Sequence, residues 1–354
     1  MIRCAVLFCA LAASARGFAT LATPATPGAQ AAAGTPADVA QGVARVNALY
    51  EQNRFVEAAQ LGEQLVKANR ESAEAWHALA RVHLAVEWTM RRDARAESAM
   101  RNVLRIDGRK PDTLRWIATA QFRQAKYDEC LPLLDELVDA DPPRLAGDPF
   151  AQMLMLRASV RLRRDALDAE ARAAARRDLD RALAAVPVHG PSRALRAEML
   201  LDDGKPAEAL ADLEVAVRAL PGDKGVHYQM QACLVRLKRR EEADRHREIW
   251  RMLNRLTDSV ASANAPDAAT RRELLLKLKE LNPDDLTRRL ELCESEISAG
   301  EIDAALAECD ALLERKHGWP AAQHLRDEAV RAKAGARPNL PNAVPAQGKD
   351  GGRE

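Results

Sequence analysis

The chain has 354 residues, and 53 Lys and Arg against 52 Asp and Glu leave a formal charge of +1. Hydrophobic residues make up 47% of it, enough for a buried core. Aromatic residues make up only 4%, which is low for a β-sandwich or a base-stacking platform, and the balanced charge argues against a broad DNA or RNA footprint. We therefore expect no nucleic-acid partner.

The first residues are typical of a targeting segment. Arg3 gives a positive start, Cys4 to Ala13 is a short apolar run, and small residues follow it. The alternative is the hydrophobic first helix of a domain, but the Ala/Thr/Pro-rich stretch that follows favours export. We predict a signal peptide over 1–19, a linker over 20–40, and a periplasmic or extracellular protein with no transmembrane segment in the mature chain. The Arg- and Ala-rich composition is typical of a bacterial protein.

From residue 41 to 334 the apolar residues recur at helical spacing, and the pattern repeats. In two segments a small residue opens a helix, apolar residues follow four and seven positions later, and a proline stands twelve positions on. Three of the steps between such small residues are 34 residues long (96 to 130, 175 to 209 and 209 to 243). The full set of small residues is Ala58, Ala96, Cys130, Ala175, Ala209, Ala243 and Ala305.

This pattern, together with Trp76, Leu79 and Ala80, resembles the tetratricopeptide repeat family. The resemblance implies an all-α solenoid of stacked antiparallel helix pairs, about seven to eight units over 41–334. Helices approach closely only where small side chains face each other, so we expect Ala118 to lie opposite Cys130. A single pair leaves an apolar face bare, and neighbouring pairs cover it.

Departures from the period predict local irregularities. The step from Cys130 to Ala175 predicts a loop over Pro142–Pro149 and a longer helix running through Arg164. A degenerate unit is expected at about 254–283, with Ala268–Leu281 as its second helix. Residues Pro320–Ala334 read as a C-terminal capping helix, and 335–354 read as a disordered tail.

Motifs that carry chemistry are missing from the sequence. It has no phosphate-binding glycine loop, no nucleophile elbow and no C-x-x-C. Glu74 and His77 have the spacing of a di-iron ligand pair, but such a site needs the motif twice, so His77 reads as a surface or groove residue. We expect no catalytic residue, no metal site and no cofactor.

Two cysteines suggest a covalent link. Cys293 and Cys309 fall on facing helices of one predicted unit, and a disulfide between them is possible in an oxidising compartment. The alternative is two buried thiols, since free cysteine packs as a small hydrophobe.

The resemblance implies that first helices line a concave groove where peptides bind. Residues four apart share a helix face, which places side chains of several units along the groove. We expect an extended acidic peptide or a terminal carboxylate there, because arginine can bond both carboxylate oxygens. The alternative is a solvated basic face, and the Lys, Asn and Arg clamp of chaperone-binding members is not found. The groove candidates are His77, Arg81, Arg115, Thr119, Phe122, Arg123, Tyr228 and Arg236.

The sequence thus predicts a non-catalytic interaction scaffold that binds a protein or peptide partner in its groove. The alternative is a structural assembly subunit of a cell-envelope complex, or a solenoid that associates with itself. An enzyme ranks third, because no nucleophile or paired acid and base stands out. The partner and the oligomeric state stay open.

Overall fold

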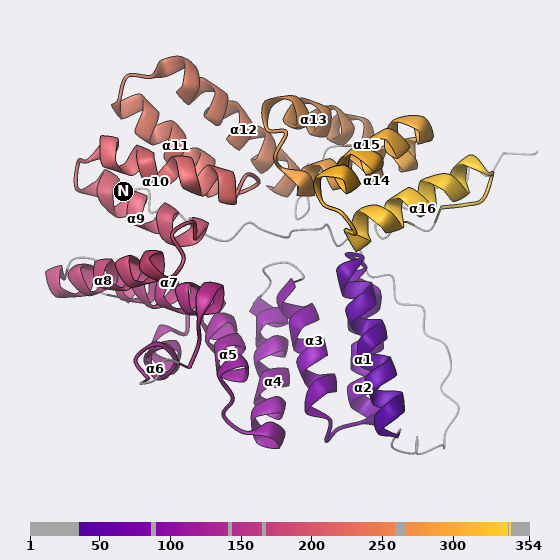
Figure 1. Ribbon diagram of the computed structural model, residues 1–354, viewed down its shortest axis with the longest axis horizontal. Helices are drawn as coiled ribbons and strands as arrows, with labels where there is room; N and C mark the ends of the chain where they lie inside the picture. The colour runs from indigo at the N-terminus through magenta and orange to yellow at the C-terminus, as the bar shows by residue number, and fades with distance from the viewer. Residues whose placement is uncertain are drawn as a thin grey trace, which may run out of the picture.

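The computed structural model describes residues 35–85, 90–140, 144–164, 168–258, 267–338 and 340. All regular elements among these residues are α-helices (Figure 1). They are α1 (Pro36–Glu51), α2 (Phe55–Ala68), α3 (Ala73–Ala85), α4 (Met90–Asp107), α5 (Pro111–Arg123), α6 (Tyr127–Val138), α7 (Gly147–Arg164), α8 (Ala169–Ala185), α9 (Gly190–Asp202), α10 (Pro206–Ala219), α11 (Lys224–Arg236), α12 (Arg240–Asp258), α13 (Ala268–Leu281), α14 (Leu286–Ala299), α15 (Ile302–Arg315) and α16 (Pro320–Lys333).

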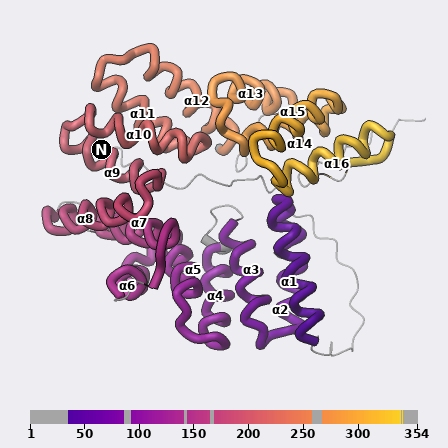
Figure 2. The backbone as a smooth tube through the Cα atoms, in the orientation of Figure 1, coloured from indigo at the N-terminus to yellow at the C-terminus, as the bar shows by residue number. Residues whose placement is uncertain are grey.

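Consecutive helices pack as pairs, and the pairs stack in chain order. Six pairs run from α1/α2 to α11/α12, the single helix α13 follows, and α14/α15 form a further pair that α16 covers. The tube in Figure 2 shows this path: α1 to α6 form one arm, α9 to α16 the other, and α7 and α8 lie at the bend between them. The predicted all-α solenoid of antiparallel helix pairs is therefore confirmed.

The turn inside a pair has a recurrent geometry. Asn53, Ala125, Gly204, Lys238 and Gly300 each have a positive φ two residues before the second helix begins. The amide of the next residue donates to the carbonyl five residues earlier in the first helix, as Lys126 does to Gln121 at 2.9 Å. This hydrogen bond closes a Schellman motif, which satisfies helix-terminal carbonyls and reverses the chain.

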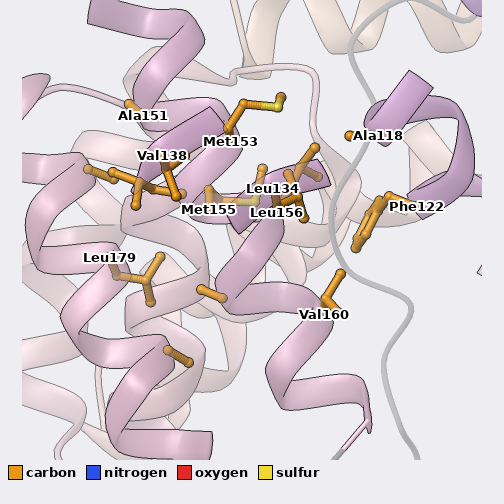
Figure 3. Packing of buried hydrophobic residues seen from close by; sticks show 14 of the residues in the cluster. Ala118, Phe122, Leu134, Val138, Ala151, Met153, Met155, Leu156, Val160 and Leu179 are labelled. Atoms are coloured by element: carbon orange, nitrogen blue, oxygen red, sulfur yellow. The ribbon is translucent and has the colours of Figure 1, made fainter. Parts of the chain in front are cut away.

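The largest core cluster joins α5 to α9 (Figure 3). Its centre is α7, where all residues from Met153 to Val160 are buried because other helices pack on every side. The expected small contact is present, since the Cys130 thiol lies 3.2 Å from the Ala118 carbonyl oxygen. Arg157 is also buried there, and it donates two hydrogen bonds to Asp178, at 3.0 and 2.6 Å.

Three predicted boundaries need correction. The first helix begins at Pro36, inside the expected linker, because Thr35 and Asp38 form a capping box and Pro36 occupies the first turn. The helix expected to run through Arg164 ends there, and α8 begins after Asp168, which caps its first amides. Leu340 of the expected tail is buried against the cluster of α14 to α16.

The degenerate unit has one described helix, α13, with the predicted bounds Ala268–Leu281. No first helix precedes it among the described residues, because α12 continues to Asp258 and takes up the start of the segment. The predicted capping helix is present as α16, and Gly335 ends it at a φ of 84°. The predicted signal peptide, residues 20–34 and residues 341–354 lie outside the described residues.

Among the described helices, none combines the length and the apolar character that crossing a bilayer requires.

Candidate functional site

The first helices of the pairs lie on the inner side of the bend. Helix α1 contacts α3, and α5, α7, α9 and α11 contact one another in succession. In a bent stack the inner elements are closest together, so these contacts identify the concave side. We call the exposed side of these helices the first-helix face.

Aromatic and cationic side chains gather on this face at α1 and α3. The Arg81 guanidinium lies 4.9 Å from the centre of the Tyr50 ring, a cation–π distance. It donates a hydrogen bond of 3.4 Å to Asn47 and lies 3.9 Å from a Glu51 carboxylate oxygen. The Arg81 side chain is 30% exposed, so water or a partner can still reach it.

The same row continues onto α5. The His77 ring stands edge-on to Trp116, with centres 6.5 Å apart, and the Arg115 guanidinium lies 4.6 Å from the Trp116 ring centre. Asp112 lies 3.0 Å from Arg115. Partial burial lowers the pKa of His77, and the nearby Arg81 charge lowers it further, so His77 is neutral at neutral pH. We call Tyr50, His77, Arg81, Arg115 and Trp116 the aromatic–cationic row.

Phe122 and Arg123 lie in the interior and do not present a surface to a ligand. Phe122 belongs to the core cluster of α5 to α9. The Arg123 side chain is only 9% exposed, lies 3.0 Å from the buried Asp93, and donates to the Leu84 carbonyl at 2.6 Å. Their position in the last turn of α5 points them at the neighbouring helices, which corrects the expectation that they line the groove.

The remaining candidates have other surroundings. Thr119 donates its hydroxyl to the Arg115 carbonyl within α5 at 2.9 Å. Tyr228 packs its ring 5.8 Å from that of Trp250, and Arg236 donates to the Leu201 carbonyl at 2.6 Å. Both lie on α11, in the other arm, so the structure brings His77, Arg81 and Arg115 together and keeps Tyr228 and Arg236 apart from them (Figure 1).

Sequence reasoning missed two aromatic members of the row, Tyr50 and Trp116. Tyr50 is the last residue but one of α1, and Trp116 directly follows a candidate arginine. The available signal was the 34-residue repeat, because Arg81 donates to Asn47 over a separation of 34 residues.

The described cysteines are all free and buried. Burial raises the pKa of Cys130 to about 12. A hydrogen bond with Cys309, together with burial, raises the pKa of Cys293 above its ordinary value. The Cys130 and Cys293 thiols therefore stay protonated at neutral pH.

Comparison with known proteins supports the repeat assignment in part of the chain. Residues 164–224 match the family described as tetratricopeptide repeat, a segment that contains α8, α9 and α10. No curated protein matches the sequence.

Several solved structures are similar in shape at low sequence identity. The chain shares 13% identity with PilW, a widely conserved type IV pilus biogenesis factor, covering 65% of this chain and 98% of that one at a TM-score of 0.48. The P58(IPK) TPR domain is 16% identical, and the match covers 84% of this chain and 89% of that one at a TM-score of 0.30. A chain of the APC/C hetero-tetramer Cut9–Hcn1 is 11% identical, and the match covers 80% of this chain and 48% of that one at a TM-score of 0.43.

All of these TM-scores are below 0.5. The family match and the paired helices agree with each other independently of these structures. The chain therefore carries a tetratricopeptide repeat segment at residues 164–224, within an all-α solenoid of stacked helix pairs.

Proposed function

We propose that this chain is a non-catalytic scaffold that binds a protein or peptide partner on its first-helix face. The observation that carries the proposal is the aromatic–cationic row, in which Arg81 and Arg115 stack on aromatic rings and remain partly exposed. Stacking holds each guanidinium in place at little entropic cost, which favours binding of carboxylates. An acidic segment of the partner is the ligand that fits this row best.

The proposed setting is an exported protein, on the basis of residues 1–19. Fractionation of the native host tests this, with detection of the N-terminus by mass spectrometry. A mature chain starting after the apolar run, outside the cytoplasm, is the expected result. An intact Met1 in the cytoplasm would contradict export.

The binding test starts with crosslinking in the native host and identification of the captured protein. Its affinity is then measured for the wild type and for the double variant Arg81→Glu/Arg115→Glu. We expect a loss of at least about tenfold and a weaker salt dependence, because two charge-assisted contacts are reversed. Arg95→Glu is the matched control, since Arg95 is an exposed arginine on a second helix. Equal affinity of the double variant and the wild type would refute the proposal.

Light scattering distinguishes the proposed scaffold from the alternative function, a subunit that associates with itself. A monodisperse monomer that binds the captured protein supports the scaffold, whereas ordered oligomers that bind nothing else support an assembly subunit.

We also propose that thiol–disulfide exchange with an oxidised dithiol protein of the export compartment converts Cys293 and Cys309 to a disulfide, while the two sulfurs of that oxidant are reduced to thiols. They lie on α14 and α15, and their thiols are hydrogen-bonded to each other. The expected result is two fewer alkylated thiols in the protein isolated without reductant than in the same protein after unfolding with reductant. Four alkylated thiols in the mature chain, unfolded without reductant, would contradict the proposal.

A further inference from the structure

An acidic side chain occupies the first-helix face in the other arm of the stack. Glu198 lies on α9, and its neighbours come from the two adjoining first helices. The Gln229 side-chain amide of α11 donates to a Glu198 oxygen at 3.4 Å, and Arg163 of α7 interacts with Glu198 electrostatically. Asp202 follows one turn further along α9.

Glu198 differs in its partners from two other enclosed carboxylates, Asp212 and Glu308. Asp212 and Glu308 are also enclosed, but each contacts two cationic side chains within 4.0 Å. Within the described part of the chain, no Lys or Arg nitrogen comes that close to Glu198. Burial, with the nearby Asp202 charge, raises the pKa of Glu198 to about 7. The protein therefore holds a carboxyl group here whose charge the nearby Arg163 stabilises only in part.

Gln229 supplies a second, independent observation. Its side chain is 4% exposed, and its Oε1 has no hydrogen-bond partner among the described residues. An unpaired buried acceptor costs free energy, and such groups concentrate where a ligand completes the hydrogen bonding. The Gln229 oxygen and the Glu198 carboxylate are both acceptors, so the missing group is a donor that carries positive charge.

The donor is best supplied by a side chain. Within the described residues no group of three His, Cys, Asp or Glu could hold a metal ion. An ammonium or guanidinium group needs only two or three acceptors, which Glu198, Gln229 and Asp202 provide. We propose that these three residues form a subsite for a Lys or Arg side chain of the protein partner. The subsite rests on the proposed function, because it lies on the same first-helix face as the aromatic–cationic row.

The two parts of the face then have opposite chemistry. The aromatic–cationic row on α1 to α5 takes an acidic segment, and the subsite on α9 and α11 takes a basic residue. A partner segment with separated acidic and basic residues therefore binds in one direction only, which gives specificity as well as affinity.

The first test needs no partner. In protein with ¹³C-labelled glutamate, the Glu198 carboxyl signal is assigned by its loss in Glu198→Gln. Arginine amide is the cationic probe, and N-acetylalanine amide is the neutral control. Arginine amide should lower the titration midpoint of Glu198, because a bound cation stabilises the carboxylate. An unchanged midpoint would overturn the subsite.

The second test uses the partner captured by crosslinking. Glu198→Gln keeps the shape of the side chain and should weaken binding about 10- to 100-fold. Glu208→Gln, an exposed change on α10, should bind as the wild type does. Full affinity of Glu198→Gln overturns the subsite, even if arginine amide binds. If Arg81→Glu/Arg115→Glu then still loses affinity, the proposed function stands without the subsite.

Discussion

Arginine side chains at the ends of first helices tie neighbouring repeats together. Arg123 donates to the Leu84 carbonyl at the end of α3, and Arg236 donates to the Leu201 carbonyl at the end of α9. Both stand two residues before the positive-φ residue of their turn, so they occupy equivalent positions in the repeat. A cation at the C-terminus of a helix satisfies carbonyls that have no partner inside the helix.

Arg123 also compensates a buried charge, so its loss should be costly. Asp93 is 1% exposed, and burial raises its pKa even beside Arg123. We predict that Arg123→Met lowers the free energy of unfolding by about 3 kcal/mol, because it leaves Asp93 buried without a cation. Arg123→Met/Asp93→Leu should recover most of this, and Arg236→Met should cost about 1 kcal/mol. Urea unfolding measures the free energy of unfolding of all three variants. A double variant no more stable than Arg123→Met would contradict the explanation.

Glu97 is a buried acceptor shared by donors on α4, on α5 and in the turn between α5 and α6. Burial alone would raise its pKa, but hydrogen bonds from Lys126, Arg101, Gln124 and Gln121 outweigh burial and lower the pKa to about 2. Its contribution to stability is therefore fully present above about pH 4.5 and is lost as the pH falls towards 2.

The wild type should lose up to about 3 kcal/mol from this group between pH 4.5 and 2. Glu97→Gln should be less stable at pH 7 and should show a flatter dependence over that range. Glu63→Gln, at an exposed position of α2, is the control and should keep the wild-type slope. Parallel curves for Glu97→Gln and the wild type in urea unfolding would refute this role.

The turns inside the helix pairs show how backbone conformation is selected. Five of these turns have a residue with positive φ, and only two of the five residues are glycine. A residue with a Cβ atom is disfavoured by roughly 1–2 kcal/mol in this conformation. Asparagine, as at Asn53, tolerates this conformation, whereas Ala125 and Lys238 are strained residues that the surrounding packing holds in place.

We predict that Ala125→Gly and Lys238→Gly each stabilise the protein by up to about 1 kcal/mol. The reverse change, Gly204→Ala, should destabilise it by about 1 kcal/mol, although the new Cβ meets nothing within 4 Å. Ala173→Gly, in the interior of α8, is the control and should destabilise. Thermal unfolding measures the stability of these four variants relative to the wild type. Destabilisation by Ala125→Gly would show that the turn carries no backbone strain.

The regular pairing of helices is interrupted at α13, and we call its contacts with α12 and α14 the joint. Helix α13 has no paired first helix among the described residues, and it packs through a leucine-rich cluster onto α12 and α14. Arg245 donates to the Leu281 carbonyl at 2.7 Å, and Asn282 donates to the Pro221 carbonyl. These contacts join the last pair and α16 to the rest of the stack.

A change in this joint should act locally, because each repeat contacts only its neighbours. Leu275 is 1% exposed, and Leu275→Ala should cost about 2–5 kcal/mol in the segment α12 to α16. Leu276 is 37% exposed on the same helix, and Leu276→Ala should cost less than about 0.5 kcal/mol. Hydrogen exchange should show lost protection in α13 to α16 and none in α1 to α6. A uniform loss of hydrogen-exchange protection along the chain would contradict a local effect of this joint.

The approach of the two ends of the stack is a property of the whole chain. Figure 1 shows the start of α16 beside the end of the arm that holds α1, and His324 on α16 interacts electrostatically with Arg54. Arg54 and His324 are 270 residues apart in the sequence, so no local pattern could have predicted that they lie close together. The bend accumulates from small rotations at each repeat interface.

Much of the architecture was readable from local patterns. Helical periodicity predicted the stacked pairs, the small contact of Cys130 with Ala118, and the bounds of α13, because helices bury a regular face. The start of α1 was also encoded locally, in the capping residues Thr35 and Asp38, although it was missed.

The site depended on contacts between repeats. Equivalent spacing placed Phe122 and Arg123 in the groove, but the packing of α5 against its neighbours buries them. Packing between neighbouring repeats also brings Arg81 over Tyr50 and Glu198 beside Gln229, each pair about 31 residues apart along the chain. Short-range periodicity specifies which side of a helix is apolar. Which polar side chains meet across a repeat interface is set by the packing angle, and this angle emerges only when the whole stack has formed.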